Sequence, residues 1–161
     1  MHSTILSLIS EDYKSEYKYI SDVDLTREMA PAYIDYISEA GEIEFDDYKE
    51  LLDTTLEKYK DFITINKDGF TITKPKELNE FLNQRALEEI IKWISDTETA
   101  QHLISNAYKL EDALGRGMGG LLIYNQEYGD LCPFISWLNN QTVNQDYPIT
   151  FKLMQTYDYH W

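Results

Sequence analysis

At 161 residues, with 43% hydrophobic and 14% aromatic residues, the chain fits one folded domain with its own core, which excludes a disordered acidic tail. The net charge of −15 argues against direct binding of nucleic acid or of anionic membranes, because both require Lys and Arg to neutralise phosphate. A single cysteine, Cys132, excludes an internal disulfide, and the N-terminus lacks the basic segment of a signal peptide. We therefore expect a cytoplasmic protein.

The first forty residues predict two helices. Apolar residues recur at helical spacing over 4–20, and a second pattern runs from Asp24, a candidate N-cap, to a stop at Gly41. Pro31 divides or restarts this second helix, because proline lacks the backbone N–H that a helix interior needs.

The stretch 46–63 predicts one strongly two-sided helix. Wound at about 100° per residue, its apolar side chains fall on one face, as in a helix that packs on a core. The apolar face comprises Tyr48, Leu51, Leu52, Leu56, Tyr59, Phe62 and Ile63. The opposite face carries what we call the acidic row: Asp46, Glu50, Asp53, Glu57 and Asp61. Like charges at this spacing repel, so the row lowers the stability of the helix.

The remainder of the chain mixes both kinds of element. The segment 62–74 predicts a β-hairpin around an Asp68–Gly69 turn, and 77–94 predicts a helix. A further helix follows Asp96 or Thr97 and ends at Gly115. After it, turn-rich and apolar runs alternate.

These elements predict an α+β fold that is mainly helical, with a hairpin near 62–74 and a small antiparallel sheet completed by the C-terminal third. We expect a single domain over 1–161, with a helical, acidic N-terminal half over 1–61 and an α+β part over 62–161.

Two motifs suggest functions that their context does not favour. Three helices followed by a hairpin is the element order of a winged helix, but a third helix that carries carboxylates would repel DNA. Residues 115–120 match G-x-G-x-x-G, yet they follow a predicted helix and precede a predicted strand. A dinucleotide site needs the reverse order, so a loop is the better interpretation.

The distribution of charge gives the main functional prediction. Residues 1–65 hold 16 acidic against 6 basic residues, a net charge of −10. Seven of the 13 tyrosines lie among these carboxylates, and aromatic anchors beside acids suit a surface that binds a basic groove. The alternative is that the rings fill the core and the acids are solvated.

We therefore predict a small inhibitor or interaction protein that docks on the basic nucleic-acid-binding surface of a nuclease or similar protein. Anti-restriction proteins, anti-CRISPR proteins and immunity proteins against nuclease toxins act in this way as classes. The predicted contact residues are the acidic row with three neighbours, Glu39, Glu42 and Glu44.

Two other functions stay open. A small enzyme or ligand-binding domain would have its site near the 115–120 loop, with Arg116 and Cys132. A structural subunit would have an acidic face that is merely solvated. No histidine, cysteine or carboxylate pattern matches a known catalytic or metal-binding spacing, so we expect no catalytic residues, cofactor or metal.

Overall fold

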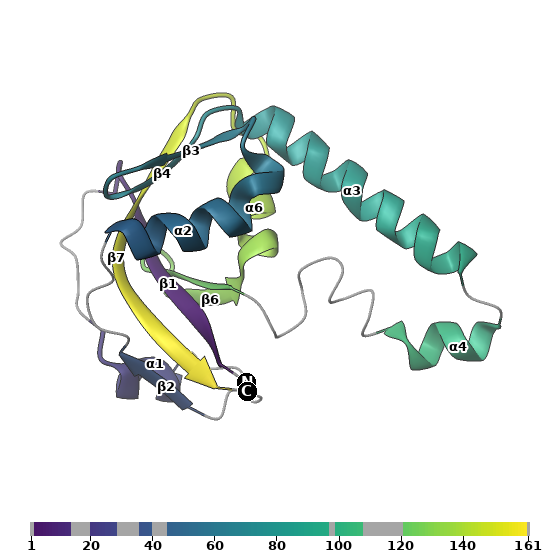
Figure 1. The fold of residues 1–161 in the computed structure, drawn as a ribbon, viewed down its shortest axis with the longest axis horizontal. Helices are drawn as coiled ribbons and strands as arrows, with labels where there is room; N and C mark the ends of the chain where they lie inside the picture. The colour runs from purple at the N-terminus through teal and green to yellow at the C-terminus, as the bar shows by residue number, and fades with distance from the viewer. Residues whose placement is uncertain are drawn as a thin grey trace.

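The computed structural model describes residues 2–13, 20–28, 36–39, 45–96, 99–107 and 121–160. Its centre is a seven-stranded mixed sheet (Figure 1). The strands are β1 (His2–Ser10), β2 (Tyr36–Glu39), β3 (Ile63–Asn66), β4 (Gly69–Ile72), β5 (Leu122–Asn125), β6 (Asp130–Pro133) and β7 (Ile149–His160). The described helical segments are α1 (Asp22–Glu28), α2 (Phe45–Leu56), the 3-10 turn η1 (Glu57–Tyr59), α3 (Pro75–Ser95), α4 (Ala100–Ser105) and α6 (Phe134–Thr142). The prediction of a mainly helical chain with a small antiparallel sheet is therefore wrong, because the sheet is the central element and is mixed.

The sheet is built around the two ends of the chain. β1 and β7 pair antiparallel along their length, from His2 opposite His160 to Ser10 opposite Phe151, and Figure 1 shows them side by side. On its other edge β7 pairs with β4 near its start and with β2 near its end. β1 pairs in parallel with β5, and the strand order is β3-β4-β7-β1-β5-β6.

The predicted helix over 4–20 is instead strand β1 over its first part, and residues 14–19 lie outside the described residues. Ile5, Leu6, Leu8 and Ile9 are all buried, and so is Ser7 between them. A central strand that is covered on both faces is apolar on both, so it lacks the alternation that marks a half-exposed strand. The short apolar run therefore fits helical spacing by accident.

Each face of the sheet has its own core. Leu6 and Leu8 of β1 point to the face that is covered by α2, the start of α3 and α6. Around them pack Leu52, Leu56, Phe70, Ile72, Leu78, Leu82, Ile123, Phe134, Trp137 and Phe151. Ile5 points to the other face, where it packs with Leu25 of α1. Strand positions alternate between faces, so one strand supplies both cores.

Two predicted helices differ from the structure at their ends. Ser21, rather than Asp24, caps α1: its hydroxyl accepts the Asp24 N–H at 3.2 Å. The predicted continuation to residue 40 is wrong over 36–39, which form β2, and 29–35 lie outside the described residues. α4 begins after Thr99, whose side chain accepts from the N–H of His102, and the rest of that predicted helix, 108–115, is likewise outside them.

The hairpin and the long helix are confirmed. β3 and β4 pair antiparallel from Ile63 opposite Ile72 to Asn66 opposite Gly69, and α3 covers the predicted 77–94. The turn is shifted by one residue, because Gly69 is already the first residue of β4.

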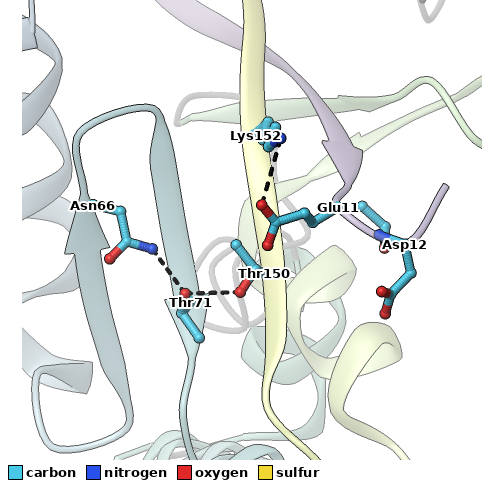
Figure 2. A network of polar contacts seen from close by, with 7 residues as sticks. Glu11, Asp12, Asn66, Thr71, Thr150 and Lys152 are labelled. Atoms are coloured by element: carbon cyan, nitrogen blue, oxygen red, sulfur yellow. Dashed lines mark hydrogen bonds and ion pairs between the residues drawn. The ribbon is translucent and has the colours of Figure 1, made fainter. Parts of the chain in front are cut away.

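Polar side chains hold the hairpin to the sheet (Figure 2). Asn66 donates to the Thr71 hydroxyl at 2.8 Å, and the hydroxyls of Thr71 and Thr150 lie 2.9 Å apart, which links β3, β4 and β7. Lys152 of β7 lies 3.4 Å from the Glu11 carboxylate just after β1. These contacts hold β3, β4, β7 and the end of β1 together. α2 and α3 precede and follow the β3–β4 hairpin along the chain.

Candidate functional site

The acidic row does not lie on one helix. α2 ends at Leu56, Glu57 begins η1, and Asp61 lies in the turn that leads to β3. The prediction of a single helix over 46–63 is wrong beyond Leu56, because the chain must leave the helix for Ile63 to start a strand. A 3-10 turn at a helix end commonly makes this transition.

The two-sided character of the segment is nevertheless present. The side chains that face the core are buried: Leu52, Leu56 and Tyr59. The carboxylates of the row whose side chains are described are all exposed: Glu50, Asp53, Glu57 and Asp61. These four carboxylates follow one another along α2, η1 and the turn and are all exposed, and we call them the acidic edge.

Three lysines reduce the charge of this edge. Lys49 lies 4.0 Å from Asp53, and both side chains are more than half exposed, so the pair adds little to stability. Lys58 and Lys60 are exposed among the same carboxylates. Four acids against three lysines leave a net charge of −1 over 49–61. The edge is a pattern of alternating charge rather than a uniform negative ridge.

The structure brings together only part of the predicted contact set. Asp46 lies in α2 and Glu39 in β2, but their side chains are not among those described. Glu42 and Glu44 lie outside the described residues, as does the 115–120 loop with Arg116.

A second surface feature was missed from the sequence. Leu87, Ile91 and Ile94 of α3 are 60%, 63% and 54% exposed, and we call them the α3 stripe. Leu87 follows the buried Leu78 by nine residues, so at about 100° per residue the two side chains point to opposite sides of the helix. The stripe therefore lies opposite the side of α3 that packs on the core. Figure 1 shows the far end of α3 extending away from the sheet.

The signal for this stripe was present in the sequence. At about 100° per residue, the apolar residues from Leu78 to Ile94 lie around most of the helix circumference, whereas one face suffices for a helix that packs on a core.

A pocket of about 320 Å³ lies between the β5–β6 connection and α6, and we call it the amide pocket. Four of its eight lining side chains are carboxamides: Asn125, Asn140, Gln141 and Gln145. The other four are Tyr128, Asp130, Cys132 and Trp137.

The β5–β6 turn shapes one wall of the amide pocket. Asn125 ends β5 and is buried, and its side-chain oxygen accepts the N–H of Glu127 at 3.1 Å. The N–H of Gly129 bonds to the Asn125 carbonyl at 2.8 Å, with Gly129 at φ 69°, where glycine avoids the strain of a side chain. The turn returns the chain so that Asp130 pairs with Asn125.

The other wall comes from α6 and the segment after it. Trp137 and Leu138 face the core, which leaves Asn140 exposed and Gln141 half-buried on the side of the pocket. Asn144 at φ 59° reverses the chain after α6, and the Gln145 N–H then bonds back to the Thr142 carbonyl at 3.3 Å. This reversal brings Gln145 to the pocket.

Cys132 does not act as a nucleophile at neutral pH. Burial, and then the nearby Asp130 carboxylate, raise the pKa of the Cys132 thiol to about 11, so the thiol stays protonated. A thiolate is the reactive form, and reactive cysteines have a lowered pKa. The raised pKa therefore argues against a nucleophilic role for Cys132.

Over the described part of the chain, no three His, Cys, Asp or Glu side chains gather as metal ligands do. The β1–β7 register places His2 opposite His160, a pairing that their positions near the chain ends did not suggest. None of the described helices combines the length and the apolar character needed to cross a membrane.

Comparison of the chain with known protein families, with curated protein sequences and with solved structures finds no match.

Proposed function

We propose that this chain is a small acidic interaction protein that docks on the basic nucleic-acid-binding surface of another protein and so competes with nucleic acid. The observation that carries the proposal is the exposure of Glu50, Asp53, Glu57 and Asp61 on a segment whose apolar side chains are buried. The groove of a nuclease or a nucleic-acid-binding enzyme presents Lys and Arg at phosphate positions, and carboxylates can occupy the same positions. Anti-restriction proteins, anti-CRISPR proteins and nuclease-toxin immunity proteins are the corresponding classes.

Two ranges of electrostatic interaction contribute differently. Before contact, and most strongly at low salt where the Debye length is long, a partner is attracted by the total charge of −15 rather than by the edge alone. At contact, the edge presents acids with lysines between them, and its net charge over 49–61 is only −1. The total charge of the molecule would therefore set the rate of encounter, and the spacing of the four carboxylates would set the specificity.

The α3 stripe supports the same class of function. Exposed apolar side chains that are contiguous on one face mark contact sites more often than isolated ones do. Charge pairs at a rim add little affinity, whereas buried apolar anchors add most of it. Leu87, Ile91 and Ile94 would supply such anchors on a helix that extends from the body of the protein.

The test begins with capture of a partner from the host at about 50 mM salt and its release at about 500 mM, because ion-pair binding weakens as the Debye length falls. The captured protein is then purified, and its Kd is measured against the variant E50K/D53K/E57K. We expect a loss of at least tenfold, which corresponds to about 1.4 kcal/mol. The same variant should no longer displace a DNA or RNA duplex from the partner.

A matched control separates pattern from total charge. The variant D12K/E80K/D146K reverses three other exposed acids and changes the net charge by the same amount. The proposal predicts that this control slows association but keeps most of the affinity at physiological salt. Equal loss in both variants, or no loss in either, would show that the edge is not the contact surface. Far-UV circular dichroism of both variants checks that the helices persist.

A further inference from the structure

Trp137, which lines the amide pocket, carries an unusual buried donor. Trp137 is 2% exposed, and its indole Nε1 is buried without a hydrogen-bond partner, the only such side-chain atom found among the described residues. An unsatisfied buried N–H lowers stability, and native proteins rarely leave one without an additional occupant such as water or a ligand.

The surroundings of the indole ring indicate where an acceptor would enter. The ring contacts three phenylalanine rings, with centroids 4.7 Å from Phe151, 6.1 Å from Phe70 and 6.2 Å from Phe134. These neighbours offer no oxygen or nitrogen. The amide pocket, which Trp137 also lines, is the polar side of its environment.

We propose that the amide pocket binds a small uncharged heterocycle, a nucleobase or nucleoside, which accepts a hydrogen bond from the Trp137 indole N–H. This function is separate from partner binding by the acidic edge and does not depend on it. The ligand would lie between the β5–β6 turn and α6, with the carboxamides along its edge.

The charge of the pocket disfavours anionic ligands. Its lining contains one carboxylate, Asp130, and no Lys or Arg. The surrounding stretch 121–148 adds Glu127 and Asp146 and contains no basic residue, so its net charge is −3. A phosphate or carboxylate ligand would be repelled and would find no cation to pair with.

The residue types of the lining fit a flat heterocycle. A carboxamide presents a donor and an acceptor side by side, and Asn and Gln use this edge to form two bonds with a base such as adenine. Tyr128 is 67% exposed at the pocket, and an aromatic ring at such a position provides a surface on which a base can stack. The volume of about 320 Å³ lies at the lower end of the range for small-molecule sites.

The experiment monitors the indole N–H directly. In a ¹H–¹⁵N spectrum of the full chain the three tryptophans give three indole signals, and Trp137→Phe assigns one of them to Trp137. Adenosine, guanosine, cytidine and uridine are titrated separately to millimolar concentration, each beside its 5′-monophosphate. We expect at least one nucleoside to shift the Trp137 signal saturably, with the signals of Trp93 and Trp161 nearly unchanged and the monophosphate at least threefold weaker.

Variants outside the core test the amide contacts without unfolding the protein. Asn140 and Gln145 are exposed, so Asn140→Ala with Gln145→Ala should weaken nucleoside binding at least tenfold. The matched control is Asn83→Ala with Gln101→Ala, which removes two exposed carboxamides from other helices and should leave binding unchanged.

Three results would overturn the proposal. The first is no saturable shift with any nucleoside, which would leave an ordered water as the occupant of the pocket. The second is a shift with a neutral monosaccharide such as glucose but with no nucleoside, which would exclude the ligand class. The third is an upfield-shifted Trp137 signal that no probe moves, which would show that the N–H points to a phenylalanine ring.

Discussion

Replacing Gly69 by alanine should destabilise the fold, because Gly69 allows two strands to approach closely. A Cβ atom at this position would lie 1.9 Å from the Phe151 carbonyl oxygen, 2.9 Å from its carbonyl carbon and 3.0 Å from the Lys152 Cα. All three atoms belong to the backbone of β7, so no flexible side chain can move aside. Only Gly129 among the described glycines has a positive φ, so the requirement at Gly69 is space rather than backbone conformation.

The structure gives the size of the disturbance. Ordinary contact begins at 3.4 Å, so the 1.9 Å approach would force β4 and β7 apart by about 1.5 Å. Backbone hydrogen bonds have lengths of about 2.9 Å and do not survive such a separation. Overpacking costs about 1–3 kcal/mol, and two lost bonds add about 0.5–1.5 kcal/mol each. Alanine also has less conformational freedom than glycine in the unfolded chain, which offsets about 0.4–1 kcal/mol of the lost stability. The expected net loss is about 2–4 kcal/mol.

The measurement is urea unfolding together with thermal unfolding followed by circular dichroism. For a chain of this size, a loss of about 2–4 kcal/mol lowers Tm by roughly 5–15 °C. Asp68→Ala serves as the control, because Asp68 is the exposed neighbour of Gly69 in the turn and should change Tm only slightly. A Gly69→Ala protein as stable as the parent would refute the close approach of β4 and β7.

Two further predictions concern the α3 stripe and Cys132. Changing Leu87, Ile91 and Ile94 together to Gln should weaken binding of a captured partner at least tenfold. It should alter Tm by less than about 4 °C, because substitutions of exposed residues within a helix change stability little. A large fall in Tm would show that the stripe packs within the chain. The pKa of Cys132 is raised from its ordinary 9.0 to about 11 in the fold, so the unfolded chain loses this proton first and stability should fall as pH rises from about 9 to about 11. Urea midpoints across that window should fall less steeply for Cys132→Ala, and parallel slopes for the two proteins would contradict the raised pKa.

Local signals in the sequence predicted local elements. The hairpin over 62–74 and α3 have patterns that depend only on neighbouring residues, and both are present. The turn was placed one residue too late because an Asp-Gly pair is typical of a tight hairpin turn. Here the glycine serves the contact with β7 instead, and that contact involves residues more than 80 positions away.

The central sheet could not be predicted in the same way. Its two main strands, β1 and β7, come from opposite ends of the chain, and pairing across such a separation leaves no local pattern. β1 is also buried on both faces, which removes the alternation that distinguishes a strand. Because the pairing of β1 with β7 has no sign in the sequence, helices dominate the predicted fold.

The candidate sites show the same division. Exposure of Glu50, Asp53, Glu57 and Asp61 followed from helical spacing, whereas their position beyond the end of α2 depended on where β3 had to begin. The amide pocket combines residues of β5, β6 and α6 with Gln145, and its main signal is the orphaned indole N–H of Trp137. Burial and hydrogen bonding of one atom are properties of the folded chain alone.

The two proposals make opposite demands on salt, which allows one titration to separate them. Partner binding by the acidic edge relies on charge, so its affinity should fall steeply as added salt shortens the Debye length. An uncharged nucleoside in the amide pocket releases no counterions, so its affinity should stay nearly constant over the same range. If the nucleoside affinity fell as steeply as the partner affinity, charge rather than the carboxamides would govern binding in the amide pocket, which would contradict the proposed ligand class. If neither fell, the contact with the partner would rest on the α3 stripe, and the carboxylates of the edge would only keep the protein in solution.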